Sequence, residues 1–185
     1  FFDVMSDFER AVEIAFGQTV VDPKLKAQAE QYLSQLQHSE EGWNLSISAV
    51  QRSIQNSAST NEQLLFWSIG TLVLCVPKKF PIIAVEAKDQ FCDMLFTWLA
   101  NVIPTGSVPI FVRNKMAQLI VVAFELQWPA RWTNFWTVLF GLLPKSDHMV
   151  DIFLRILDTV DERIVDQDFT VDRQRSTTIK DAMRE

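Results

Sequence analysis

Residues 111–132 read FVRNKMAQLIVVAFELQWPARW, and the character of this stretch decides the fold. It starts with the polar residues Arg113, Asn114 and Lys115 and becomes almost wholly apolar from Leu119 onward. A helix on the surface of a globular protein keeps one polar face along its whole length. This helix has a polar head and an apolar tail, so we expect neighbouring helices to cover its C-terminal half on most sides.

Apolar residues recur at helical spacing along nearly the whole chain, and Gly (5) and Pro (7) are scarce among the 185 residues. No convincing strand pattern is present. Prolines and polar loops divide the pattern into helices of about 3–17, 24–37, 41–54, 60–75, 82–102, 109–127, 130–143 and 147–162, with a last helix from about 172. Pro77 is predicted to end the fourth helix and Pro81 to open the fifth. The sequence therefore predicts an all-α fold.

The second helix of each successive pair begins near residue 24, 60, 110 or 148. These starts are about 36 to 50 residues apart, which brackets the roughly 40–47 residues of HEAT-type repeats. We therefore expect a solenoid of stacked helix pairs, with a globular helical bundle as the alternative. Trp128 and Trp132, on either side of Pro129, are predicted to be apolar anchors of the core at a sharp corner.

The composition bears on whether the protein binds nucleic acid, forms disulfides or spans a membrane. The formal net charge is −6 and the basic residues are dispersed, so nucleic-acid binding is not suggested by composition alone. Cys75 and Cys92 lie in apolar helical patterns and are predicted to be buried free thiols. No apolar run reaches the roughly 18 residues of a membrane span. The chain begins without Met and stops in an apparent helix, so we expect it to be part of a longer protein.

Motifs for catalysis or metal binding are missing from the sequence. The two histidines, His38 and His148, have no nearby Cys and no partner His four residues on. No Gly-x-Ser-x-Gly motif, Gly-rich phosphate loop or dinucleotide fingerprint occurs. The carboxylate pairs Asp158/Asp161 and Asp166/Asp168 are typical of solvated charges. We predict no enzymatic activity, no catalytic residues, no cofactor and no metal.

Three segments carry a resemblance to a known family. FVRNKMAQLIVVAFELQWPARWTNFW, with its Arg-Asn-Lys head, apolar helix and Trp-Pro-x-x-Trp corner, resembles the importin-β superfamily of nuclear transport receptors. AEQYLSQLQHSEEGW, in the opening helices, is similar to the Ran-binding domain of that superfamily. DIFLRILDTVDERIVDQD followed by RQRSTTIKDAMRE resembles its tRNA-exporting branch. SIGTLVL in the fourth helix departs from the pattern, because relatives carry polar residues there.

This resemblance implies a right-handed superhelix of HEAT repeats. Residues 1–76 are expected to form importin-β-like Ran-binding repeats, and 77–185 to form exportin-type repeats continuous with them. The second helix of each pair would line the concave face. The implied partners are Ran in its GTP form, tRNA in the context of the full receptor, and nuclear pore proteins. No membrane is involved, and the receptor would shuttle between nucleus and cytoplasm.

The head of the helix at 109–127 would then face a partner. The candidate Ran- or RNA-binding residues, some from the preceding inner helices, are Arg113, Asn114, Lys115, Gln118, Gln63, Phe66 and Gln28. Two structural alternatives stand beside this reading. Asn114 would cap or bond to the preceding loop, and Arg113 would pair with a carboxylate of a neighbouring repeat. The alternative functions are another karyopherin that carries protein cargo, or a HEAT-repeat adaptor without a GTPase partner.

Overall fold

The computed structural model describes residues 4–17, 21–56, 61–165 and 173–184, and these residues contain helices and no β-strand. The long helices are α1 (Val4–Phe16), α2 (Pro23–Gln37), α3 (Glu40–Gln55), α4 (Glu62–Lys79), α5 (Val85–Asn101), α6 (Ile110–Gln127), α7 (Phe135–Leu142), α8 (Asp147–Val160) and α9 (Arg173–Ala182). The short helices are η2 (Ile103–Thr105), η3 (Leu143–Lys145) and the π-helix η4 (Asp161–Val165). The predicted all-α fold is confirmed.

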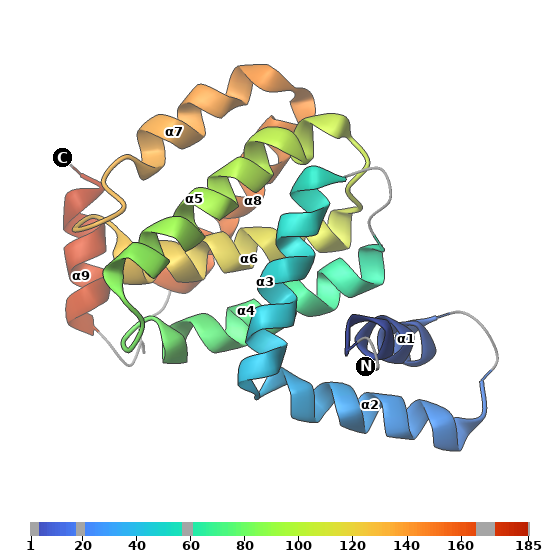
Figure 1. The fold of residues 1–185 in the computed structure, drawn as a ribbon. Coiled ribbons are helices and arrows are strands. Elements are labelled where there is room, and N and C mark those ends of the chain that lie inside the picture. Colours follow the sequence, from blue (N-terminus) through green and yellow to red (C-terminus); the bar gives the residue numbers. More distant parts are fainter. Residues whose placement is uncertain (1–3, 18–20, 57–60, 166–172, 185) are drawn as a thin grey trace.

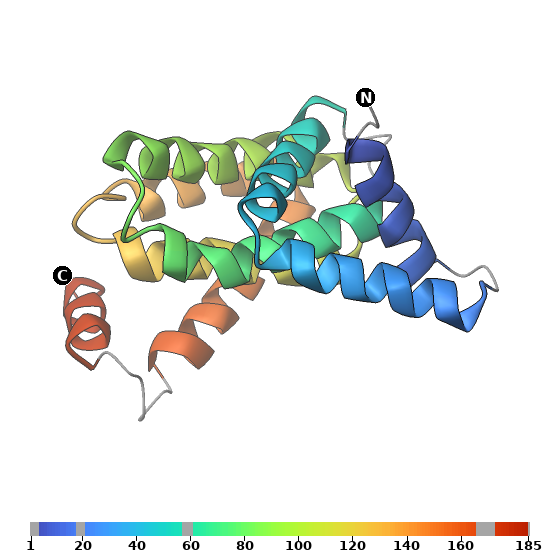
Figure 2. The same ribbon diagram turned by 60° about the horizontal axis from the view of Figure 1, so that its bottom comes forward.

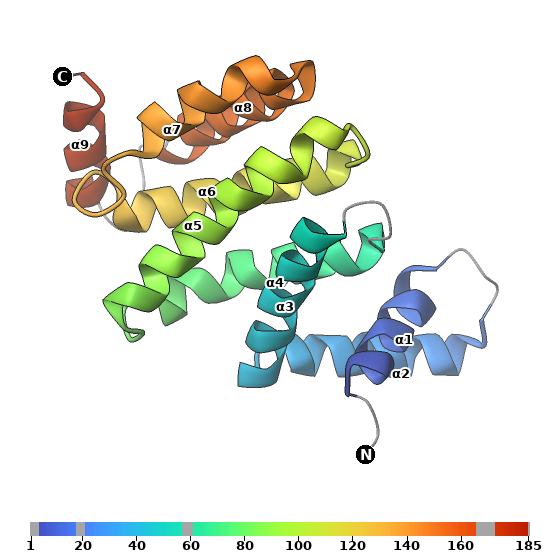
Figure 3. The same cartoon turned by 45° about the horizontal axis from the view of Figure 1, so that its top comes forward.

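The first eight long helices form two layers (Figures 1 and 3). Helices α1, α3, α5 and α7 make the odd-numbered layer, and α2, α4, α6 and α8 make the even-numbered layer. Within these layers α4 packs along α6 and α6 along α8, while α5 contacts both α3 and α7. Helices α1 and α9 lie at opposite ends of the stack (Figure 2). The chain is therefore a HEAT-type solenoid of helix pairs.

Polar caps fix where several helices begin. The Asn61 side chain accepts hydrogen bonds from the backbone N–H groups of Gln63 and Leu64, both at 3.0 Å, and so opens α4. Ser39 caps α3 and Ser146 caps α8 in the same way. Such side chains satisfy N–H groups that have no partner inside the helix. Asn61 is thus the N-cap residue of α4.

Two predicted helix boundaries are wrong. Pro77 does not end α4, which continues to Lys79. Proline removes a single backbone donor, and the next turn still closes because the Phe80 N–H donates to the Val76 carbonyl at 2.9 Å. Pro81 does not open the next helix; it lies in a turn before α5, which begins only at Val85.

The seventh helix also begins later than predicted. Residues 128–134 form a corner before α7, in place of a helix from about 130. The backbone N–H groups of Arg131 and Trp132 both donate to the Gln127 carbonyl, at 2.8 and 3.2 Å, which turns the chain back sharply. The Trp128–Pro129 peptide bond is cis.

The apolar core consists of two clusters. A main cluster runs from α3 to α9, and a smaller N-terminal cluster includes Phe8, Leu33 and Trp67. Every residue from Leu119 to Phe124 in α6 is at most 2% exposed, so neighbours do cover the apolar tail of this helix. Trp128 and Trp132 are buried as predicted, and the ring centroids of Trp132 and Phe96 lie 4.7 Å apart.

Candidate binding site on the even-numbered layer

Arg113, at the head of α6, joins three elements. Its Nη1 lies 2.6 Å from Oδ2 of Asp151 on α8, and its Nε donates to the Val108 carbonyl at 3.0 Å in the loop before α6. The Arg113 side chain is only 13% exposed. The predicted alternative, pairing with a carboxylate of a neighbouring repeat, is therefore present in the structure.

Asn114 belongs to the same network. Arg155 donates from Nε and Nη2 to the two carboxylate oxygens of Asp151, both at 2.9 Å, and from Nη1 to Oδ1 of Asn114. The hydrogen bond from Arg155 lowers the pKa of Asp151, with further lowering by the charges of Arg155 and Arg113 against the opposing effect of burial. Asn114 thus bonds to α8 and not to the preceding loop. Sequence reasoning missed Arg155, although its spacing of four from Asp151 was a signal.

Lys115 faces the opposite neighbour, α4. Its Nζ lies 5.5 Å from the ring centroid of Phe66 and donates to Oε1 of Gln118 at 3.0 Å. A cation at this distance from an aromatic face is attracted by the ring quadrupole. The Phe66 ring in turn meets Phe111 edge-on at 5.4 Å, and Phe111 is 43% exposed. Lys115, Phe66 and Gln118 are therefore brought together as one half-buried polar and aromatic patch.

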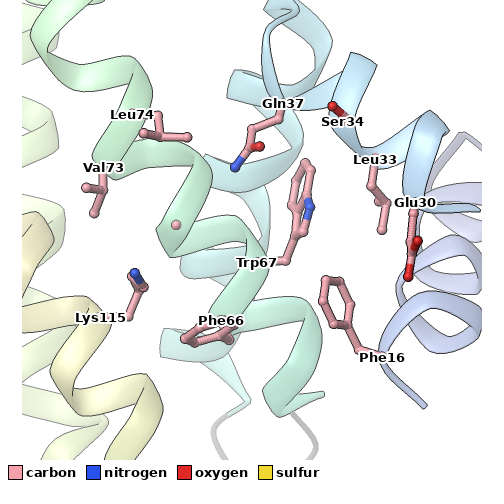
Figure 4. A pocket seen from close by; sticks show the side chains of 11 residues that line it. Phe16, Glu30, Leu33, Ser34, Gln37, Phe66, Trp67, Val73, Leu74 and Lys115 are labelled. Carbon is pink, nitrogen blue, oxygen red and sulfur yellow. The ribbon is translucent and has the colours of Figure 1, made fainter.

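A groove of about 490 Å³ lies beside this patch, between α2 and α4. Its walls come from α1, α2, α4 and α6, and its lining residues are Phe16, Glu30, Leu33, Ser34, Gln37, Phe66, Trp67, Gly70, Val73, Leu74 and Lys115. Figure 4 shows Lys115 on one side and Glu30 on the other, with Phe66 and Trp67 between them. We refer to this feature as the α2–α4 groove.

The remaining candidates lie at different places. Gln63 donates from Nε2 to the Phe16 carbonyl at 3.1 Å and so holds the end of α1 against α4. Gln28 is exposed on α2 and does not line the groove. Sequence reasoning missed Trp67, Gly70 and Leu74 as lining residues. The signal was the nearly wholly apolar or small SIGTLVL segment, which contains Gly70 and Leu74 and directly follows Trp67.

No group of three or more His, Cys, Asp or Glu side chains in the described part of the chain could hold a metal ion. Burial raises the pKa of the Cys92 thiol to about 12, with smaller contributions from Asp89 and Asp93. Burial also raises the pKa of Cys75. Both cysteines are buried and free, as predicted, and protonated thiols are poor nucleophiles.

Among the described helices, none has the length and apolar character needed to cross a lipid bilayer. Lys78 and Lys79 lie in the last turn of α4, and Lys79 pairs there with Glu40 of α3.

Comparison with known proteins shows what the C-terminal part of this chain is similar to. Residues 109–185 match the family model described as Exportin 1-like protein. The matched segment runs from the loop before α6 to the end of the chain, and the helical solenoid fold agrees with this similarity.

Most of the chain is similar to exportin-T. It is 26% identical to human exportin-T over 168 residues, which cover 89% of this chain and 17% of that protein. It is 25% identical to the Arabidopsis thaliana protein over 191 residues (98% of this chain, 19% of that protein). It is 23% identical to the Dictyostelium discoideum protein over 185 residues (98% and 16%). The chain thus spans less than a fifth of the length of these relatives.

Proposed function

We propose that this chain is the part of a nuclear export receptor that binds Ran in its GTP form on the even-numbered layer. With the rest of the receptor it takes part in nuclear export of tRNA and shuttles between nucleus and cytoplasm. The chain acts as a binding scaffold and performs no chemistry. Similarity to exportin-T supports the class of function. The observation that carries the choice of surface is the contact of Lys115 with Phe66 at the edge of the α2–α4 groove.

This surface has the composition of a protein interface. Interfaces combine an apolar, often aromatic centre with a polar rim. Phe16, Phe66 and Leu74 supply apolar and aromatic area in the groove, while Lys115 and Glu30 supply charges at its edges. Such an arrangement suits a folded protein partner better than a phosphate backbone, which needs clustered basic groups.

The proposal assigns different roles to the N-terminal and C-terminal parts of the chain. Residues 1–76 would form the Ran-binding repeats, and 77–185 the exportin-type repeats that continue the stack. Val76 and Pro77 both lie inside α4, so the two parts share a helix. Lys115 is the contribution of the second part to the groove.

Weak binding of tRNA by this chain alone is part of the proposal. The net charge is −6. Arg113 and Arg155 pair with Asp151, and Arg163 pairs with Glu125. Basic groups that already have carboxylate partners release fewer counterions when they meet phosphates. We therefore infer that tRNA is held by the whole receptor together with Ran. Nuclear pore proteins are further proposed partners of the whole receptor.

The test is a binding titration of the chain with Ran loaded with GTP or with GDP. The proposal expects binding that is clearly tighter for the GTP form. Equal affinity for the two forms, or none for either, would contradict it and favour a HEAT-repeat adaptor without a GTPase partner. Labelled tRNA, titrated with and without Ran·GTP at low and physiological salt, tests the second part. Tight binding of tRNA without Ran at physiological salt would place the RNA site on this chain.

A further inference from the structure

Neighbouring helices of the even-numbered layer pack closely against each other, except α2 and α4. Helix α4 packs along α6, and α6 along α8, whereas α2 packs mainly against α1 and α3. The two core clusters also meet here. Leu33 and Trp67 belong to the N-terminal cluster, while Phe66 and Val73 pack against the main cluster. The α2–α4 groove therefore lies over the boundary between two separately packed parts of the protein.

The groove is apolar and open to solvent. Phe16 and Leu74 are each 47% exposed, although both side chains line it. At Gly70 no heavy atom lies within 4 Å of the position that a Cβ atom would take. Small-molecule sites enclose most of the ligand surface, whereas half-exposed walls are typical of grooves that receive a polypeptide.

Charges of opposite sign border the groove on opposite sides. Lys115 comes from α6 and Glu30 from α2, and Figure 4 shows the apolar lining residues between them. Lys115 is held in place by Gln118 and by the Phe66 ring. A positioned charge selects a partner with the complementary charge and penalises one with the same charge.

We propose that the α2–α4 groove receives one amphipathic helix of a partner protein. The apolar ridge of that helix fills the space over Gly70, an acidic residue faces Lys115, and a basic residue faces Glu30. A helix is the form that fits, because the walls are helices and the described residues offer no strand edge for an added strand. The bound helix would touch both core clusters and so brace the boundary between them. This inference rests on the proposed function in taking Ran·GTP as the first partner to test.

The first experiment fills the groove. Gly70→Trp places a large side chain in it, and Gly141→Trp is the matched control, because Gly141 also lies in a helix with no atom within 4 Å of its Cβ position. Gly70→Trp should weaken binding of Ran·GTP by roughly tenfold or more, the effect of losing a central interface contact. Gly141→Trp should bind like the parent. Thermal melting of both variants checks that the fold is kept.

Failure of this inference is distinguishable from failure of the proposed function. If the parent and Gly70→Trp bind Ran·GTP equally well, the groove is not the docking site and Ran binding stands. If the parent does not bind Ran·GTP, the proposed function is wrong, and synthetic peptides then decide about the groove.

The peptide experiment tests the charge arrangement without Ran. Three helical peptides share one leucine ridge and carry Glu and Lys, Glu and Glu, or Lys and Lys at their two ends. The parent chain should prefer the Glu and Lys peptide, whichever way round it binds. Glu30→Lys should shift the preference to the Glu and Glu peptide, and Lys115→Glu to the Lys and Lys peptide. Three outcomes would overturn the proposal. The charge variants keep the peptide preference of the parent, the peptides bind Gly70→Trp as tightly as the parent, or no peptide binds.

Discussion

Arg113 on α6 and Asp151 on α8 form an ion pair with 2.6 Å between Nη1 and Oδ2, and Arg155 holds the same carboxylate from the other side. Together with the bond from Arg113 to the Val108 carbonyl, the pair ties one repeat to the next. The polar head of α6 is therefore divided. Arg113 and Asn114 face α8, while Lys115 faces α4 and the groove.

Arg113→Ala should lower the free energy of unfolding by about 1–3 kcal/mol, because it leaves the Val108 carbonyl without this donor and removes one partner of Asp151. The value lies below that of a fully buried pair, since the Asp151 side chain is 34% exposed. Urea denaturation measures it. The control is Arg52→Ala, whose pair with Glu9 is exposed on both sides (48% and 43%) and should cost about 0–1 kcal/mol. Equal stabilities of the two variants would contradict the structural role of Arg113.

The Asp151 network should also make stability depend on pH. The pKa of the Asp151 carboxyl group is lower in the folded state than in the unfolded state, so folding favours the ionised carboxylate. The stabilisation is therefore fully present above the unfolded-state pKa of about 3.9 and is lost as the pH falls through the lower folded-state value. Urea denaturation of the parent and of Asp151→Asn between about pH 3 and pH 7 measures this. The difference between them should shrink below about pH 4; a difference that grows there would contradict the assigned direction.

Trp132→Ala should act on stability alone. The Trp132 side chain is 5% exposed and packs against Phe96 and Phe135, with ring centroids 4.7 and 4.8 Å away. Truncation of a buried Trp costs about 3–5 kcal/mol. Denaturation of this variant beside Thr133→Ala, whose side chain is exposed, provides the comparison. A variant that melts like the parent but loses partner binding would make Trp132 a contact residue.

The helical stack could be predicted from the sequence because local signals specify it. The apolar spacing in α6 and the Asn61 cap each act within a few residues. The groove could not be predicted, because it depends on how far apart α2 and α4 pack, which no local pattern encodes. The same limit explains Arg113: the sequence shows a cation at a helix head, but only the packing of α8 decides that Asp151 lies beside it.

Gly42→Ala should destabilise the turn between α2 and α3. A Cβ atom at Gly42 would lie 1.9 Å from the Leu36 carbonyl oxygen, which belongs to the backbone and cannot move alone. Overpacking of this kind costs about 1–3 kcal/mol. Gly141→Ala is the control, since its Cβ position is open and Ala is the better helix former by up to about 1 kcal/mol. Thermal melting measures both effects. The midpoint temperature should be lower than that of the parent for Gly42→Ala, and equal or higher for Gly141→Ala.

Lys115→Met should weaken binding of Ran·GTP while leaving the fold intact. Methionine keeps apolar contact with the Phe66 ring but removes the charge that borders the groove. Charges at an interface rim act mainly on the association rate, so we expect a two- to fivefold slower association, roughly, and a weaker dependence on salt. Surface plasmon resonance at several salt concentrations measures both, with Lys88→Met on α5 of the odd-numbered layer as the control. Arg113→Ala should change stability more than association. If Lys115→Met keeps the parental association rate and salt dependence, Lys115 does not face the partner, and the Phe66 contact serves only to pack α4 on α6.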